Sequence, residues 1–472
     1  MADRQFAKNI TAAFTAQFFN YAFSIVASLV IPKMLGMEHF GYWQLFIFYS
    51  TYVGLLHFGL SDGIYLKYGG YEPDRLPTNL IGGQFIIMVA WQMAIGIVGA
   101  IAAMLYCGDP NRQFVWMLTA IYMVIVNATW FWGYVFQAVN FTRLYSGAVI
   151  ISKAGFLISI IVMSFVKVSS YKPFIACYVV AQGAAMFFMV YLAKKNFEFG
   201  RIQIRESFSA LVDNIKIGIN LTLSNIVSSF ILGVGRVMVD HTSGIKTFGI
   251  LSLSITLCNF FLQFITQISM VLFPALKKVD HEVSTKMYIC MRKMLGYLGV
   301  ALLVVYLPIA ILLKIWLPNY SQSIYYLIFL LPICVYDAKM QLLYNTYLKM
   351  YRKERLLLKI NVITLAFSTL LCLVSVFGFK SITLVALSMM LAISFRSIVA
   401  NYFVGKIVGV NEDDNIFFEV LFTIVFVAGN CVLSDSMAFC IYIAILIVYI
   451  SLRKTDIKES LDELVFCYSK IK

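Results

Sequence analysis

The stretch Ile10–Ile31 reads ITAAFTAQFFNYAFSIVASLVI and contains no charged side chain. A helix needs roughly 20 mostly apolar residues to cross the hydrocarbon core of a bilayer, so this stretch predicts a membrane-spanning helix. Basic residues precede it, as in a signal peptide, but the apolar part of a signal peptide has only about 7–15 residues and ends at a cleavage site of small residues. Here the run is longer and ends before Pro32 and Lys33, which favours a retained first helix.

Apolar runs of this kind continue along the whole chain. Of its 472 residues, 61% are hydrophobic and 13% are charged, whereas soluble domains carry about 25% charged residues. Strands of a membrane β-barrel would be segments of about ten alternating residues, which continuous runs such as Ile219–Val234 exclude. The sequence therefore predicts an all-α polytopic membrane protein with about 14 spans. The predicted spans are 10–32, 40–60, 80–106, 114–139, 144–166, 173–193, 217–239, 247–273, 293–314, 323–346, 358–378, 381–404, 416–433 and 437–452.

The basic residues are distributed unevenly between the two sides of these spans. Both termini and every second loop carry about 26 cations together, and the other loops carry about 8; cations accumulate on the cytoplasmic side. Both termini are therefore predicted to be cytoplasmic. Topology and anionic lipid headgroups explain the net charge of +14, so nucleic acid is not needed as a partner. The tail 455–472 has apolar residues at helical spacing and is expected to lie along the inner membrane surface.

The sequence lacks the common signatures of metal, cofactor and nucleotide sites. The nine cysteines form no C-x-x-C pair, and the four histidines are not spaced as metal ligands. Neither a phosphate-binding Walker loop nor a dinucleotide fingerprint occurs. We therefore expect no metal, no cofactor and no ATP hydrolysis by this chain. A membrane glycosyltransferase or polymerase would also need catalytic groups on a sizeable outer loop, and the predicted outer loops have only about ten residues.

An internal repeat divides the chain. Segments 36–45 and 244–253 share the pattern Gly-x3-Phe-Gly-x3-Leu, and both lie between the first and second helices of a predicted six-helix half. Transporters are often built from two related halves. The predicted parts are a first six-helix bundle at 1–195, a second at 196–405, two additional membrane helices at 406–454 and an amphipathic cytoplasmic tail at 455–472.

Three short segments carry a resemblance to a known family. They are FGLSDG at 58–63 within the segment 36–70, GRVMVD at 235–240, and LFPAL at 272–276. With the layout of about 1–410, they resemble bacterial polysaccharide repeat-unit flippases, in the polysaccharide-transporter branch of the multidrug/oligosaccharidyl-lipid/polysaccharide exporter superfamily. The resemblance implies two six-helix bundles that face a central cavity. It also implies alternating-access translocation of undecaprenyl-pyrophosphate-linked repeat units for O-antigen, capsule or exopolysaccharide.

The same resemblance implies a bacterial cytoplasmic (inner) membrane location, and a polymerase and glycosyltransferases of the same pathway as possible partners. Two related functions stay open at this point. A peptidoglycan lipid-precursor flippase would also have a cationic cavity. A drug:cation antiporter of the superfamily would be expected to carry an aspartate in its first helix, and 10–32 contains none.

Polar residues form stripes along two predicted spans. Gln17, Asn20, Ser24 and Ser28 follow one another at steps of three, four and four, which places them on one helix face. The seventh span carries Asn225 among its equivalent positions. Polar side chains avoid lipid, so these faces are expected either to line a cavity or to form hydrogen bonds between helices.

Among the basic residues within or at the end of predicted spans, three are candidates for a binding site. They are Lys153, Arg236 and Arg396. An ionisable group at a helix centre costs roughly 2.5–3.5 kcal/mol and usually marks a pathway. Cations without nearby carboxylates suit an anionic cargo, so we predict that these three residues face one central cavity and bind the phosphates of the cargo. Gln17 and Asn20 on the first span and Asn225 on the seventh are predicted to bind the substrate as well.

Other assignments of the charged and aromatic residues stay open. Arg236 is also spaced to pair with Asp240, and Asp337 and Lys339 are expected to pair with other helices. Asp62 closes the second span. The sugars of the cargo could rest on the aromatic residues Trp130, Trp132 and Tyr134, for which packing or a place in an interfacial belt is the alternative.

The predicted topology can be tested with a reporter fused after Lys454. Because the basic loops place both termini in the cytoplasm, a cytoplasmic reporter should be active there and an extracytoplasmic reporter inactive. The opposite result would contradict the orientation and the even number of spans together.

Overall fold

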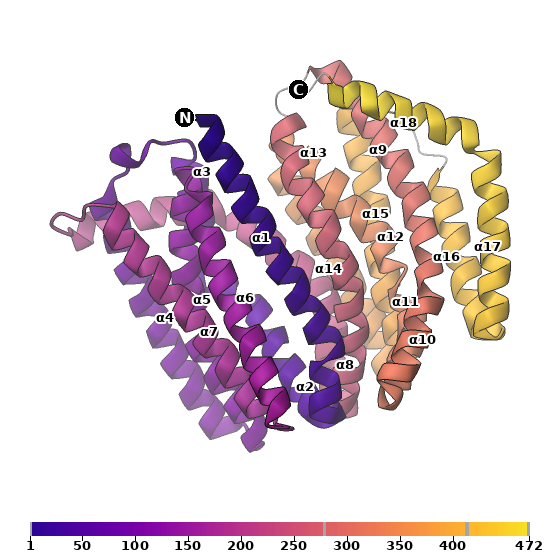
Figure 1. The fold of residues 1–472 in the computed structure, drawn as a ribbon, viewed down its shortest axis with the longest axis horizontal. Coiled ribbons are helices and arrows are strands. Elements are labelled where there is room, and N and C mark those ends of the chain that lie inside the picture. The colour runs from indigo at the N-terminus through magenta and orange to yellow at the C-terminus, as the bar shows by residue number, and fades with distance from the viewer. Residues whose placement is uncertain (1, 277–279, 411–414, 470–472) are drawn as a thin grey trace. The chain divides into compact units, whose positions relative to one another are not determined.

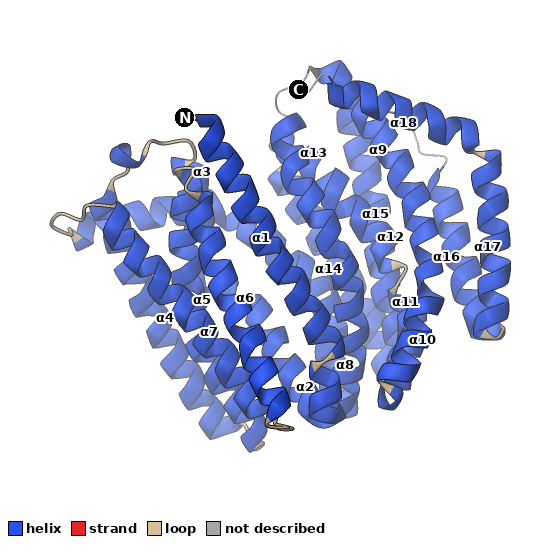
Figure 2. Cartoon of the chain, viewed as in Figure 1, coloured by secondary structure: helices blue, strands red, loops and turns tan. Residues whose placement is uncertain are grey.

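The computed structural model describes residues 2–276, 280–410 and 415–469, and within them every regular element is a helix (Figure 2). The apolar runs become helices because a chain in hydrocarbon must satisfy its backbone hydrogen bonds internally, and a helix does so within one segment. The predicted all-α polytopic membrane fold is confirmed.

The chain forms two compact units, Met1–Ser229 (unit 1) and Phe230–Lys472 (unit 2). A long helix, α8 (Ile204–Leu276), begins in unit 1 and continues into unit 2. The domain boundaries predicted from the sequence were based on the internal repeat, whereas the two units are defined by contacts between residues. The predicted parts, 1–195, 196–405, 406–454 and 455–472, stay a prediction.

Unit 1 is a helical bundle. It contains α1 (Ala2–Leu29), α2 (Ile31–Tyr52), η1 (Val53–His57), α3 (Leu60–Tyr68), α4 (Thr78–Tyr106), α5 (Pro110–Ala138), α6 (Thr142–Phe165), α7 (Tyr171–Asn196) and the first part of α8 (Figure 1). Helix α6 packs against α1 and α7, and α5 packs against α4 and α7. A core of buried aromatic and aliphatic side chains, including Phe131, Phe136 and Met189, joins these helices.

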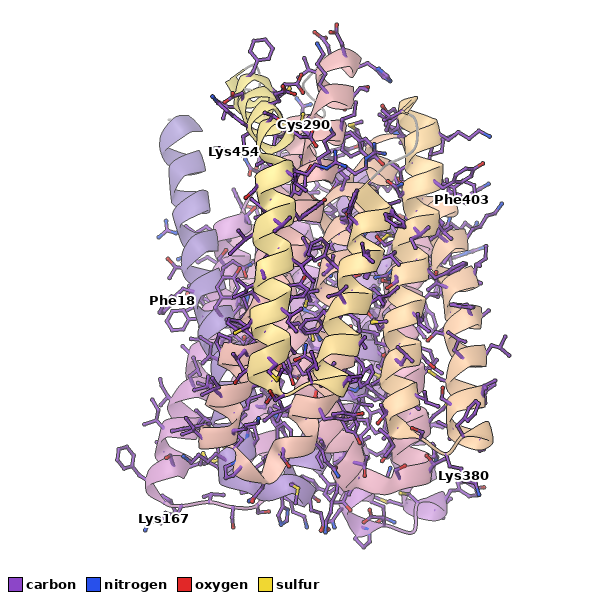
Figure 3. The ribbon with its side chains drawn as sticks, turned by 90° about the vertical axis from the view of Figure 1, so that its right-hand side faces the viewer. Phe18, Lys167, Cys290, Lys380, Phe403 and Lys454 are labelled. Carbon is purple, nitrogen blue, oxygen red and sulfur yellow. The ribbon has the colours of Figure 1, made fainter. Side chains whose placement is uncertain are left out.

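Unit 2 is a second bundle. It contains the rest of α8, α9 (His281–Leu302), α10 (Tyr306–Trp316), α11 (Ser321–Leu330), α12 (Ile333–Lys339), the π-helix η5 (Met340–Tyr344), α13 (Asn345–Met350), α14 (Glu354–Leu373), α15 (Ile382–Val408), α16 (Asn415–Val432), α17 (Asp435–Leu452) and α18 (Lys454–Ser469). Helix α14 packs on α15, and α16 packs on α9 and α17. Figure 3 shows Cys290 and Lys454 at one end of this unit and Lys380 at the other.

The apolar helices of the described residues make this a multi-pass membrane protein. Nine of them are long and apolar enough to cross a membrane, and counting each of two bent helix pairs as one span gives up to eleven. The predicted spans 217–239 and 247–273 both lie within α8, while 10–32 and 40–60 form one of the bent pairs. The predicted span 416–433 corresponds to the shorter apolar helix Ile416–Val432. These three differences account for the lower number of spans, up to eleven in the described residues compared with about 14 predicted from the sequence.

The two copies of the repeat have the same backbone geometry. Gly36 interrupts α2 with φ 69° and ψ 173°, and Gly244 interrupts α8 with φ 79° and ψ 175°. The phenylalanine that follows four residues later, Phe40 or Phe248, is fully buried in each copy. These dihedral angles lie in a region that is essentially open to glycine alone. The repeat predicted from the sequence is therefore also a repeat in structure at this turn.

Helix α18 packs along α9. Asp456 accepts hydrogen bonds from the Lys293 ammonium at 2.7 Å and from the Tyr297 hydroxyl at 2.6 Å. Partial burial raises the pKa of Asp456, but these bonds outweigh burial and hold the pKa below its ordinary value. The amphipathic tail thus has a defined attachment to unit 2, and its place along the membrane surface stays a prediction.

Replacing either Gly36 or Gly244 by alanine should destabilise the protein by about 1–3 kcal/mol, because a side chain strains this backbone region. Crowding does not contribute, since no atom lies within 4 Å of an added Cβ at either position. Gly99→Ala is the matched control: the site in α4 is equally open, and alanine should stabilise the helix there by up to about 1 kcal/mol. Thermal unfolding of the purified protein measures these effects. Equal melting temperatures for the three variants would contradict the backbone explanation.

Candidate functional site

Lys153 lies in the middle of α6, half-buried within unit 1. Its Nζ donates a hydrogen bond to the Tyr178 hydroxyl at 3.3 Å and lies 4.0 Å from the centroid of the Phe23 ring. A cation over an aromatic face is attracted by about 0.5–1 kcal/mol when exposed and by about 2 when desolvated. Helices α1, α6 and α7 therefore hold the ammonium group together.

The Lys153 side chain lines a cavity of about 170 Å³ within unit 1, which we name the lysine cavity. Amide and hydroxyl groups from α1, α5, α6 and α7 line it, namely Asn20, Thr129, Ser152 and Gln182. Aromatic residues complete much of the wall, namely Tyr122, Trp130, Tyr145 and Tyr178. The cavity thus offers one positive charge, neutral hydrogen-bonding groups and aromatic rings.

Lys153 has no acidic partner in the described chain. No carboxylate there lies within 4 Å of its Nζ, whereas Lys339 and Arg396 each pair with one. Placing a charge at a helix centre costs roughly 2.5–3.5 kcal/mol. Lys153 offsets this cost with aromatic rings and a hydroxyl group instead of an anion. The positive charge of the lysine cavity is therefore not neutralised by a direct contact.

A second cavity of unit 1, of about 350 Å³, shares Trp130 and Tyr145 with the lysine cavity. We name it the aspartate cavity because Asp62 lines it, with a residue exposure of only 6%. The Thr222 hydroxyl donates a hydrogen bond of 2.5 Å to the Asp62 carboxylate. The other lining residues are Thr51, Gly54, His57, Tyr134, Asn225, Ile226 and Ser229.

A break in the helix after η1 places Asp62 in this cavity. Phe58 (φ 51°) and Gly59 (φ 87°) adopt left-handed conformations, and α3 begins at the next residue. Asp62 therefore lies in the first turn of α3, where the helix dipole favours a negative charge. A Cβ added at Gly63 would lie only 1.9 Å from the Asn214 carbonyl oxygen. Glycine at position 63 thus permits the close approach of α8 that brings Thr222 to Asp62.

The remaining predicted residues of unit 1 lie at these two cavities or beside them. Asn20 lines the lysine cavity and donates a hydrogen bond of 3.2 Å to the Gln17 side-chain oxygen. Asn225 lines the aspartate cavity. The structure therefore brings Asn20, Gln17 and Asn225 into the same region of unit 1 as Lys153.

Arg236 and Arg396 belong to unit 2. The Arg236 Nε donates a hydrogen bond of 3.1 Å to the Ser252 hydroxyl, and the guanidinium lies 5.1 Å from the centroid of the Phe248 ring. Arg396 is only 3% exposed and forms an ion pair with Asp337. A carboxylate therefore neutralises Arg396, in contrast to Lys153. Binding of cargo phosphates by Arg236 and Arg396 stays a prediction.

Asp337 and Lys339 each pair with a different helix, as the sequence led us to expect. Asp337 on α12 pairs with Arg396 on α15 and also accepts a hydrogen bond from Gln341 at 2.6 Å. Lys339 pairs with Glu419 on α16, and both side chains are buried. The two ion pairs connect α12 to α15 and α16, and their four charges sum to zero.

The three aromatic residues considered for sugar binding separate in the structure. Trp130 lines both cavities of unit 1 and Tyr134 lines the aspartate cavity. Trp132 faces the packed core, with its ring centroid 5.3 Å from that of Phe85. Core packing therefore accounts for Trp132.

Several lining residues were not found from the sequence, among them His57, Tyr145, Gln182 and Thr222. Each is a single uncharged polar side chain, and such residues occur throughout the chain. Four different elements (η1, α6, α7 and α8) supply them, so no spacing within one segment could indicate that they meet.

No family model and no curated protein matches the sequence. Solved structures do match the fold. An inward-facing multidrug resistance MATE family transporter of the MOP superfamily has a TM-score of 0.60 at 11% identity, covering 85% of this chain and 98% of that chain. The lipid II flippase MurJ, in an inward closed conformation, has a TM-score of 0.57 at 14% identity, covering 95% and 99%. A MOP superfamily transporter from Pyrococcus furiosus has a TM-score of 0.51 at 10% identity, covering 86% and 95%. The chain therefore has the fold of these transporters.

Removing one partner of the buried pair in unit 2 should be costly. Arg396→Met leaves the Asp337 carboxylate buried without its guanidinium and should destabilise the protein by about 3–5 kcal/mol. The double variant Arg396→Met/Asp337→Leu removes both charges and should recover most of this loss. Thermal unfolding measures both. A double variant no more stable than the single one would contradict the assignment of the loss to an unpaired charge.

Proposed function

We propose that this protein is a flippase that moves an undecaprenyl-pyrophosphate-linked oligosaccharide from the cytoplasmic to the outer leaflet of a bacterial inner membrane by alternating access. The observation that carries the proposal is Lys153, which borders a polar cavity and has no carboxylate within 4 Å in the described chain. The pyrophosphate group that joins the lipid to the sugars is an anion that this cation can bind.

The other groups of the lysine cavity suit the sugar part of this cargo. Asn20 and Gln182 offer both donors and acceptors, and Thr129 offers a hydroxyl group, for hydrogen bonds with sugar hydroxyls. The Trp130 ring offers a flat apolar surface. Lysine is a compact charge on a flexible stem, which suits a phosphate group that must move relative to the protein.

The fold supports a transporter rather than an enzyme. One solved neighbour is named a lipid II flippase, and others are named multidrug resistance transporters. One fold therefore serves cargoes of different chemistry, and the groups of the site have to decide which cargo fits. A cation in a hydrogen-bonding cavity favours the lipid-linked anion.

Two alternatives stay open within this fold. A flippase for a peptidoglycan lipid precursor would use the same cation for the same kind of phosphate group. A drug:cation antiporter would need a negative site, and Asp62 is the observation that favours it. An antiporter would transport a cationic molecule, whereas both flippases would transport an anionic lipid. The two flippases differ in the sugar that the lipid carries.

A reconstituted system tests the proposal. Purified full-length protein is placed in sealed vesicles with a fluorescent lipid-pyrophosphate oligosaccharide in both leaflets, and an impermeant quencher reports the lipid that reaches the outer leaflet. Transport should proceed without ATP. Lys153→Gln should slow it by roughly tenfold, the loss expected when one charge contact of about 1.4 kcal/mol is removed. Lys153→Arg should retain most of the rate because the charge remains.

Lys172→Gln is the matched control. Lys172 also lies over an aromatic ring, 5.5 Å from the centroid of Phe114, but it is exposed at the start of α7. This variant should transport as the wild type does. Transport of a cationic amphiphile in place of the pyrophosphate lipid would overturn the proposal in favour of the antiporter.

A further inference from the structure

Unit 2 contains a cavity of about 380 Å³ beside the loop that follows the π-helix η6 (Val374–Gly378), and we name it the loop cavity. All of its lining residues belong to unit 2. Val239 and Val385, which are fully buried, form part of an apolar wall. Lys380 and Ser243 add an ammonium group and a hydroxyl group. The cavity thus combines apolar surface with one positive charge, and no carboxylate is among its lining residues.

The charge of Lys380 is not used within the described chain. Its side chain forms no hydrogen bond and no ion pair with another described residue. Asp240, the acidic residue closest to the cavity along α8, is buried and does not line it. Lys314 at the end of α10, by contrast, pairs with Asp435 at 2.5 Å. An anion can therefore reach the Lys380 ammonium without displacing a carboxylate.

The backbone fixes the place of Lys380 beside the cavity. Its φ is 50°, a left-handed conformation that is uncommon for residues other than glycine, asparagine and aspartate. The Ser381 N–H donates a hydrogen bond of 3.1 Å to the Ser375 carbonyl oxygen, which holds the turn together. Unfavourable backbone conformations of this kind cluster at functional sites, so the turn at Lys380 calls for a functional explanation.

The two halves of the repeat differ at this place. Lys167, in the loop between α6 and α7 of unit 1, has a left-handed backbone as Lys380 does, with a φ of 55°. The two residues directly before the repeated glycine are not alike, however. Unit 1 has methionine and leucine at 34–35, whereas unit 2 has Thr242 and Ser243. Unit 1 therefore repeats the lysine without the hydroxyl groups.

Ser243 carries the hydroxyl group that is best able to donate to a ligand. The Thr242 hydroxyl donates to the Met238 carbonyl oxygen at 2.8 Å, and a hydroxyl group has only one proton to donate. The Ser243 Oγ lies 3.4 Å from the Thr242 Oγ1, so the Ser243 proton is available either to Thr242 or to a ligand. An ammonium group and a hydroxyl donor that line one cavity suit the oxygens of a phosphate group.

The surroundings of the loop cavity favour a lipid over a free anion. The apolar segment Glu354–Gly378, long enough to cross a membrane, ends directly beside it. Phe377 and Phe379 at this end are 66% and 67% exposed. In a multi-pass membrane protein such side chains meet acyl chains, while a lysine at the end of a span reaches the headgroups. A free phosphate would gain nothing from the apolar wall.

We propose that the loop cavity binds the phosphate group of an anionic phospholipid, with Lys380 as the charge contact and Ser243 as the hydrogen-bond donor. The amine of a zwitterionic headgroup would find no carboxylate among the lining residues, which favours a headgroup with a net negative charge. The proposal is independent of the proposed function.

The predicted orientation places this lipid in the outer leaflet. Lys380 lies at the end of unit 2 opposite to Lys454 (Figure 3), and Lys454 is predicted to be cytoplasmic. The accumulation of cations in cytoplasmic loops therefore does not account for Lys380, whereas a bound phosphate group does.

Native mass spectrometry of the full-length protein in a neutral detergent tests the proposal, because it counts the lipids bound to each molecule. Dioleoyl phosphatidylglycerol is the probe. The wild type should bind a first lipid more tightly than the following ones. Lys380→Gln should weaken this first step by about tenfold, through the loss of a charged contact, and Ser243→Ala by about threefold, through the loss of a neutral hydrogen bond.

Two further variants keep the result interpretable. Lys380→Gly removes the charge and suits the left-handed backbone, so it should lose the same affinity without a lower melting temperature in the absence of lipid. Saturating phosphatidylglycerol should raise the melting temperature of the wild type more than that of this variant. Lys167→Gln is the matched control, since it removes an exposed lysine with the same backbone conformation, and it should bind the lipid as the wild type does.

Three outcomes would overturn the proposal. Equal weakening by Lys167→Gln and Lys380→Gln would assign the effect to general surface charge. Equal affinity for dioleoyl phosphatidylcholine would remove the requirement for an anionic headgroup. Displacement of the first lipid by an equal concentration of inorganic phosphate would show that the cavity binds a free anion. None of these outcomes bears on Lys153, so the proposed function is tested separately.

Discussion

The structure depends on one constraint: a charge inside hydrocarbon must be offset by something other than water. In unit 2 two buried ion pairs satisfy it, since the charges of Asp337 with Arg396 and of Lys339 with Glu419 sum to zero. Unit 1 satisfies it differently. Lys153 is held by aromatic rings and a hydroxyl group. The buried Asp62 carboxylate of unit 1 accepts a hydrogen bond from the Thr222 hydroxyl and lies in the first turn of α3. A charge that no opposite charge contacts keeps its capacity to bind a charged ligand, which is why we place the site in unit 1.

The two neighbouring cavities of unit 1 contain the groups with which a charged ligand could interact. A pyrophosphate bound at Lys153, as we propose, would contact a positive charge, hydrogen-bonding groups and the shared wall of Trp130 and Tyr145. The aspartate cavity, which shares that wall, is lined by the buried Asp62 carboxylate. The proposed flippase activity therefore rests on how these charges are distributed in unit 1. The glycine turn after η1 and the close approach of Gly63 to α8 fix that distribution in space.

Much of the fold could be predicted from the sequence because hydrocarbon imposes helices on every apolar run. The repeat that contains Gly36 and Gly244 could also be predicted, because both segments share one pattern of glycine, phenylalanine and leucine. The backbone dihedral angles at its two glycines are known only from the structure. Pairing of Asp337 and Lys339 with other helices was expected, but the residues with which they pair could not be predicted. Arg396 and Asp337 are far apart in the sequence and meet only because α12 packs on α15. The sequence therefore predicted Arg396 and Lys153 alike as phosphate-binding residues. Only the packing of the helices shows that Arg396 pairs with a carboxylate and that Lys153 contacts a hydroxyl group and an aromatic ring.

The most direct test of the account is whether the Lys153 ammonium touches the phosphorus-bearing group of the cargo. Solid-state NMR on the full-length protein in membranes, with ¹⁵N-labelled lysine side chains and bound geranylgeranyl pyrophosphate, measures ¹⁵N–³¹P dipolar coupling. The account predicts a short-range coupling in the wild type that disappears in Lys153→Arg, where a guanidinium replaces the labelled ammonium. A coupling that persists unchanged in Lys153→Arg would show that another lysine holds the phosphates and would contradict the account.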